Sequence, residues 1–139
     1  DLAKTSDFFS IGTNDLVQYT LAADRNNETL SKGYNYFNPA VLNLIRMTIE
    51  SGKQNGRAVS LCGEMAGDPL AVPLLLGMGL EILSATADNI LPVKKGILNS
   101  DLKKLQKDYQ SVKNKSQKQI KQFYTKLLEE MNLKEEGVL

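Results

Sequence analysis

Short apolar runs alternate with helical patterns along the first hundred residues of the chain. Residues 8–11, 58–61 and 82–85 have the length and apolar character of buried strands, and each run ends in small or polar residues. A helical pattern follows each run, and this order is typical of parallel strands joined by helical crossovers. The pattern therefore predicts an α/β fold with a small parallel sheet.

Two of the expected helices have clear start signals. Asn38 is a favourable N-cap and Pro39 a favourable first residue, and apolar residues then recur at helical spacing up to Gly56. Asp68 and Pro69 form a similar pair after the second strand. We therefore expect one long helix to begin at Pro39 and another helix to begin at Pro69.

The remaining helices are short or belong to a tail. Short helices are expected at residues 15–21 and from residues 89–92 onward. Two tail helices follow, one from Ser100 to about residue 110 and one from Ser116. The last helix has an apolar stripe made of Ile120, Phe123, Tyr124, Leu127, Leu128 and Met131. Such a stripe favours packing on the chain's own domain over a cofactor or membrane surface.

The composition and charge of the chain limit its number of domains and its kinds of partner. At 139 residues, 42% of them apolar, the chain is one domain at most or a piece of one. Its longest apolar run, residues 70–80, is too short to span a bilayer. The net charge of +1 is divided between a slightly acidic first part and a slightly basic tail, which does not indicate a nucleic-acid partner. The start, without methionine or a signal-like segment, leads us to expect a piece of a longer protein.

Cys62 is the single cysteine, and the chain has no histidine. A lone cysteine forms no internal disulfide, which favours a reducing compartment such as the cytoplasm. Most such thiols are buried and inert. This one, however, ends a strand-like run beside Gly63, where α/β proteins place reactive groups. Because no histidine is available as a base, the thiol is better suited to donate a proton than to attack as a nucleophile.

Polar residues also follow the first strand. Asn14 and Asp15 could simply cap a helix, but Asp15 offers the hard oxygen that Mg²⁺ prefers, and Asn14 can donate to a phosphate or carboxylate. Gly12 would let a ligand approach the backbone. Further along, Arg25 is either a surface residue or a fork that binds an anionic oxygen.

Two acidic residues after Cys62 are weaker candidates for a direct role in the reaction. Glu64 has no visible partner, and Asp68 is better explained as a helix cap. A metal ligand, an amide, an arginine and an acidic thiol at one site would suit a small phosphorylated enol, because the cations neutralise the phosphate and the thiol protonates carbon.

Two long stretches resemble a known family. Residues 7–25, DFFSIGTNDLVQYTLAADR, and residues 61–95, LCGEMAGDPLAVPLLLGMGLEILSATADNILPVKK, are similar to the signatures of the phosphoenolpyruvate-utilising enzymes. Within this family the continuation of the second stretch, residues 74–95, most resembles the Enzyme I proteins of the bacterial sugar phosphotransferase system. Pyruvate phosphate dikinases and phosphoenolpyruvate synthases share both signatures more loosely. Because two long motifs occur in the right order, the resemblance is specific over residues 6–100. The tail resembles the family only weakly.

The resemblance implies a fold and a set of roles. The chain would form the last three strand–helix units of a (β/α)₈ barrel, followed from residue 101 by terminal helices. Cys62 would protonate the enolpyruvate carbon and so release pyruvate. Asn14, Asp15 and Arg25 would bind phosphoenolpyruvate, and Asp15 would also bind Mg²⁺.

The resemblance also implies partners that lie outside the chain. The phosphoryl group would pass to a histidine on a separate domain, then to a phosphocarrier protein, in a homodimeric cytoplasmic enzyme of sugar uptake. Further substrate arginines and a second metal carboxylate would lie upstream. We therefore expect the fragment alone to be inactive. A non-catalytic interaction module that keeps the fold is the alternative of another class.

Overall fold

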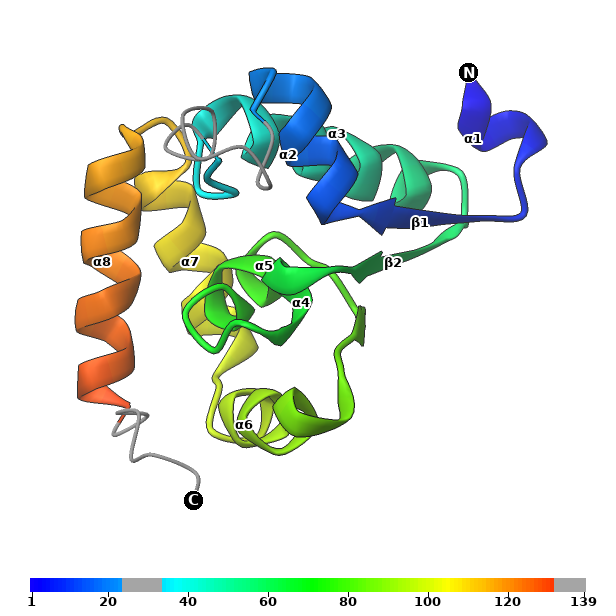
Figure 1. Cartoon of the computed structure of the whole chain (residues 1–139). Coiled ribbons are helices and arrows are strands. Elements are labelled where there is room, and N and C mark those ends of the chain that lie inside the picture. The colour runs from blue at the N-terminus through cyan, green and yellow to red at the C-terminus, as the bar shows by residue number, and fades with distance from the viewer. Residues whose placement is uncertain (24–33, 132–139) are drawn as a thin grey trace.

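The computed structural model describes residues 1–23 and 34–131 (Figure 1). In chain order its elements are α1 (Leu2–Thr5), β1 (Phe8–Gly12), α2 (Thr13–Leu21), α3 (Pro39–Gln54), β2 (Ala58–Cys62), α4 (Glu64–Gly67), α5 (Val72–Gly77), β3 (Ile82–Ser84), α6 (Ala87–Leu98), α7 (Leu102–Val112) and α8 (Gln117–Glu130). The α/β class predicted from the apolar pattern is confirmed.

The strands form one parallel sheet in the order β1-β2-β3. The register pairs Phe8 with Ala58 and Gly12 with Cys62, and Cys62 in turn with Ser84. All three predicted strands are confirmed, with boundaries that differ by one residue at their carboxyl ends. Because the strands are parallel, the residues that follow β1 and β2 meet at the same edge of the sheet.

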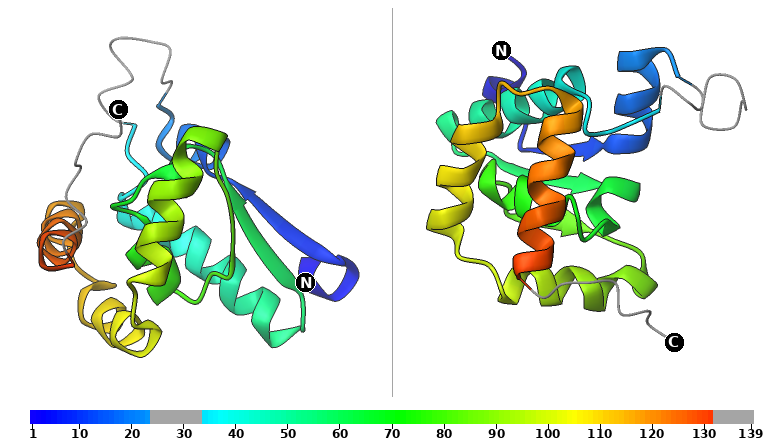
Figure 2. Two further views of the ribbon diagram at one scale, coloured as in Figure 1. Left: turned by 90° about the horizontal axis from the view of Figure 1, so that it is seen from below. Right: turned by 90° about the vertical axis from the view of Figure 1, so that its left-hand side faces the viewer.

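One face of the sheet packs on the core. Ile11, Val59 and Leu61 are buried and belong to this core, whereas the alternate positions Ser60 and Cys62 are only half-buried. Helix α3 contacts both β1 and β2. The tail helices α7 and α8 are further away, at the opposite end of the molecule from α1 (Figures 1 and 2). The less covered face therefore carries Cys62.

Helix α3 begins as predicted. The Asn38 side chain accepts a hydrogen bond from the Ala40 backbone N–H at 2.9 Å, and Pro39 is the first helical residue. After the helix, Gly56 takes the left-handed conformation with φ of +63°, which favours glycine.

The predicted start of the helix after β2 is wrong. The Asp68 side chain accepts from the Leu70 N–H at 2.8 Å and closes a turn, and the helix α5 begins only at Val72 instead of Pro69. The short helix α4, which lies between β2 and this turn, was not predicted. At four residues it is too short to produce an apolar periodicity.

The predicted start of the helix after β3 is also wrong. Helix α6 begins at Ala87, after Thr86, and contains Pro92 in its interior. Proline removes one helical hydrogen bond and usually marks an end or a kink, which is why the sequence pattern placed the helix start near it.

The two tail helices are confirmed. Helix α7 begins after Asp101, whose side chain accepts from two backbone N–H groups, and therefore slightly later than Ser100. Ser116 opens α8 through a capping box with Gln119. In α8, Tyr124 is fully buried together with Ile120 and Leu127. The apolar stripe thus packs on the chain's own core, as predicted.

Candidate functional site

The ends of β1 and β2 are tied together by Thr13. Its hydroxyl donates a hydrogen bond to the Cys62 carbonyl oxygen at 2.8 Å, and its side chain is 1% exposed. Gly12 and Cys62 are already neighbours through the strand register. The Asn14–Asp15 segment and the backbone of Cys62 therefore lie at one corner of the sheet, where the sequence places the ends of these two strands.

Asn14 holds the backbone that follows Cys62. Its Oδ1 accepts from the Glu64 backbone N–H at 3.1 Å and from the Tyr34 hydroxyl at 3.3 Å. With the oxygen occupied, the Nδ2 group is the part of this side chain that can donate to a ligand.

Gly63 permits this close approach. Its φ is +98°, and a Cβ at this position would lie 2.5 Å from the Thr13 Oγ1 and 2.9 Å from the Asn14 Oδ1. Any side chain at position 63 would therefore displace the two residues that join the strand ends.

Asp15, the residue after Asn14, is exposed. It lines an open groove of about 560 Å³ along the free edge of β1, together with Ser10, Gly12 and Tyr19. Its carboxylate is therefore accessible to a ligand. Among the described residues no group of three or more histidine, cysteine, aspartate or glutamate side chains could hold a metal ion.

Asp68 is held by two hydrogen bonds. Its Oδ1 accepts from the Leu70 N–H, and its Oδ2 accepts from the Tyr36 hydroxyl. Burial, and then the hydrogen bond to Asp68, raise the pKa of Tyr36 well above its usual value. Asp68 therefore closes a turn and positions Tyr36. It does not cap α5, which begins at Val72, so the predicted helix-cap role is wrong.

Arg25 lies outside the described residues. Glu64 is exposed and contributes its backbone N–H to Asn14. Sequence reasoning missed Thr13, Tyr34 and Tyr36, and the one available signal was the pair of tyrosines just before the helix start at Asn38.

The family model described as PEP-utilising enzyme, PEP-binding domain, matches residues 1–102. The chain therefore belongs to the phosphoenolpyruvate-utilising enzymes, through their phosphoenolpyruvate-binding domain. The match covers all the strands and the whole corner formed by Thr13, Asn14 and Cys62.

The similar curated proteins are phosphoenolpyruvate-protein phosphotransferases. The one from Bacillus subtilis is 56% identical over 92 residues, which cover 66% of this chain and 16% of that protein. The one from Geobacillus stearothermophilus is 52% identical over 106 residues, or 76% of this chain and 18% of that protein. The one from Listeria monocytogenes is 49% identical over 114 residues, or 82% and 20%. The chain thus spans a fifth or less of these relatives.

Among the described helices, none combines the length and the apolar character that crossing a bilayer requires.

Proposed function

We propose that this chain is the C-terminal part of the phosphoenolpyruvate-binding (β/α)₈ barrel of a phosphoenolpyruvate-protein phosphotransferase. Residues 1–100 would supply the last barrel units and residues 101–139 the terminal helices. Parallel sheets are normally covered on both faces, whereas this sheet packs on its core mainly through one face. Closure with further strands would turn the other face into a barrel interior.

The observation that carries the proposal is the meeting of Cys62 with the Asn14–Asp15 segment at the carboxyl ends of adjacent parallel strands. Active sites of barrels of this kind lie at that end. There the Asn14 Nδ2 would donate to the substrate, and Arg25 would bind its anionic group.

The thiol of Cys62 would complete the reaction. Transfer of the phosphoryl group to a protein histidine outside this chain breaks the bond between phosphorus and the enol oxygen. The thiol then gives its proton to the methylene carbon of enolpyruvate, which becomes the methyl group of pyruvate. A proton from solvent restores the thiol.

Asp15 fits a role in binding Mg²⁺. Mg²⁺ is usually held by one or two carboxylates together with substrate phosphates and water, and Asp15 is an exposed carboxylate beside the β1 edge. When bound, the ion would neutralise charge on the phosphate. Further carboxylate ligands would come from outside this chain.

The wider setting follows from the same assignment. The relatives are named as phosphotransferases, which disfavours a dikinase or a synthase. The complete enzyme would be a cytoplasmic homodimer that acts in sugar uptake and phosphorylates a small phosphocarrier protein through another domain. No feature of the described residues favours a non-catalytic interaction module.

Replacement of the thiol tests this proposal. In the longer phosphotransferase that contains this chain, Cys62→Ser should lower kcat for pyruvate release by about 100-fold, the typical contribution of a positioned general acid, and leave KM within about threefold. Ser111→Ala, at an exposed position of α7 away from the corner at Cys62, is the control and should retain activity. The isolated 139-residue chain should release no pyruvate. A raised KM with an unchanged kcat in Cys62→Ser would contradict the assigned role.

A further inference from the structure

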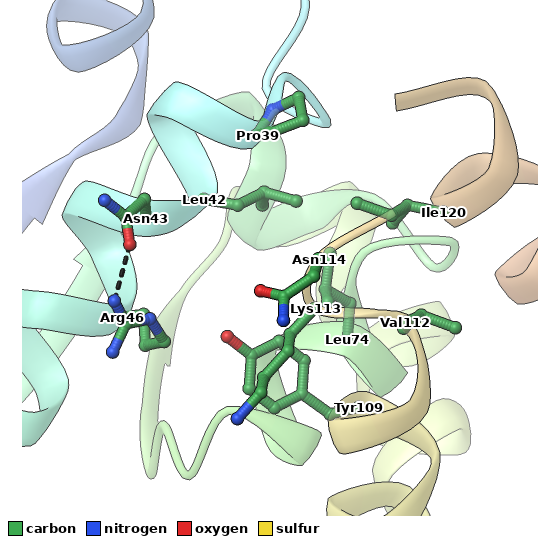
Figure 3. A pocket seen from close by; sticks show the side chains of 10 residues that line it. All are labelled: Pro39, Leu42, Asn43, Arg46, Leu74, Tyr109, Val112, Lys113, Asn114 and Ile120. Atoms are coloured by element: carbon green, nitrogen blue, oxygen red, sulfur yellow. Dashed lines mark hydrogen bonds between the residues drawn. The ribbon is translucent and has the colours of Figure 1, made fainter. Parts of the chain in front are cut away.

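A second cavity, of about 260 Å³, lies between α3, α5 and the tail, and it shares no lining residue with the corner at Cys62 (Figure 3). Asn43 and Arg46 project into it from α3. Tyr109, Lys113 and Asn114 face them from α7 and the segment after it. The apolar lining includes Leu42, Leu74, Val112 and Ile120.

The polar side of the cavity is rich in hydrogen-bond donors. The Arg46 Nη1 donates to Glu50 at 2.7 Å and its Nη2 donates to Asn43 at 2.6 Å, so the guanidinium is held in place while other N–H groups remain. In the part of the chain that the structure describes, the side chains of Lys113 and Asn114 have no hydrogen-bond or ion-pair partner.

Tyr109 adds a further donor. Burial raises the pKa of its hydroxyl, which therefore stays protonated at neutral pH. No acidic residue lines the cavity among the described residues, but Glu50 pairs with the lining residue Arg46. Two cationic side chains, of which Arg46 is paired with Glu50, and three neutral polar side chains surround an apolar floor. This lining is complementary to a ligand with an anionic head and a short apolar part.

We propose that this cavity binds a small organic anion, with its carboxylate or phosphate head between Arg46, Lys113 and Asn114 and its apolar part on Leu42 and Leu74. The volume corresponds to roughly nine water molecules at liquid density, so the ligand is a small metabolite rather than a nucleotide. Lys113 and Asn114 lie beyond residue 102, where the family match ends. A ligand here would therefore hold the tail against α3 of the phosphoenolpyruvate-binding domain.

Binding can be measured on the 139-residue chain by NMR titration with three probes of similar size: hexanoate, butyl phosphate and the neutral hexanamide. We expect at least one anion to bind with a Kd of about 1 mM or tighter and to shift the side-chain amide signals of Asn43 and Asn114. Hexanamide should bind at least tenfold more weakly. The stronger anion identifies the head group. Equal binding of hexanamide, or no shift with either anion, would overturn the proposal.

Charge variants test the assigned contacts. Arg46→Gln and Lys113→Gln should each weaken binding by about tenfold, because each removes a charge-assisted hydrogen bond. Glu50→Gln should strengthen binding, because it removes the carboxylate that competes for Arg46. Lys103→Gln, near the start of α7 and outside the cavity lining, is the matched control and should bind as the wild type does. Unchanged binding in Arg46→Gln, or weaker binding in Glu50→Gln, would refute the site.

Discussion

Two side chains join strand ends that are far apart in the sequence. Thr13 and Asn14 bind the segment around Cys62 across separations of 49 and 50 residues. The positions of Cys62 and Asn14 could be predicted, because each follows a short apolar run that identifies a strand end. The hydrogen bonds of Thr13 and Tyr36 could not be predicted, because a contact between distant single residues leaves no periodic signal.

The close packing around Gly63 can be tested by substitution. Gly63→Ala should lower the free energy of unfolding by about 2 kcal/mol, because the new Cβ meets Thr13 and Asn14 and the positive φ is unfavourable for alanine. Gly12→Ala is the control, since nothing lies within 4 Å of its added Cβ and its φ is −81°. Urea unfolding of both variants would measure the difference, and equal stabilities would contradict the packing described for this corner.

Tyr36 gives a prediction about pH. Its pKa is raised in the fold relative to the unfolded value of about 10. The resulting stabilisation is complete below pH 10 and is lost as the pH rises through the folded-state pKa. Unfolding free energies measured between pH 8 and 11 should fall, and Tyr36→Phe should make the fall shallower. The exposed Tyr19 supplies the control, Tyr19→Phe. An equally steep fall in Tyr36→Phe would exclude this contribution.

At the level of elements, cap chemistry predicted helix starts only where the cap was followed by a long periodic helix. Asn38 with Pro39 is one such case and Ser116 is another, and both helices begin where expected. The Asp68–Pro69 pair resembles the Asn38–Pro39 pair in sequence. It closes a turn, however, and the helix begins only at Val72. Local signals therefore identify a possible cap without determining whether a helix follows it directly.

The close packing of α5 on α7 can be tested by a substitution at the helix contact. A Cβ on Gly77 would lie 2.7 Å from the Leu105 carbonyl oxygen and 3.1 Å from the Tyr109 Cβ. Gly77→Ala should therefore push the two helices apart and lower the free energy of unfolding by about 2 kcal/mol, the usual scale for overpacking. Thermal unfolding measures the effect. A variant as stable as the wild type would show that the helices can separate at little cost.

At the scale of the whole molecule, the sequence predicted the parallel sheet and the packing of the tail, since both follow from apolar periodicity. It did not determine whether three strand–helix units form an open sheet or part of a closed barrel, because closure depends on strands outside the chain. The structure has an open sheet whose less covered face carries Cys62 and Ser60. This face is where we propose that barrel closure would form the reaction site.

The proton transfer that we assign to Cys62 can be observed directly by exchange of pyruvate methyl hydrogens in D₂O. In the reverse direction the Cys62 thiolate would remove a methyl proton and leave the enolate. The thiol would then exchange this proton for a deuteron from D₂O and return the deuteron to the carbon. With Mg²⁺ present, we expect the longer phosphotransferase to exchange these hydrogens at a rate that NMR can follow. Cys62→Ser should lose most of the exchange, and the control Ser111→Ala should keep it. Undiminished exchange in Cys62→Ser would contradict the account.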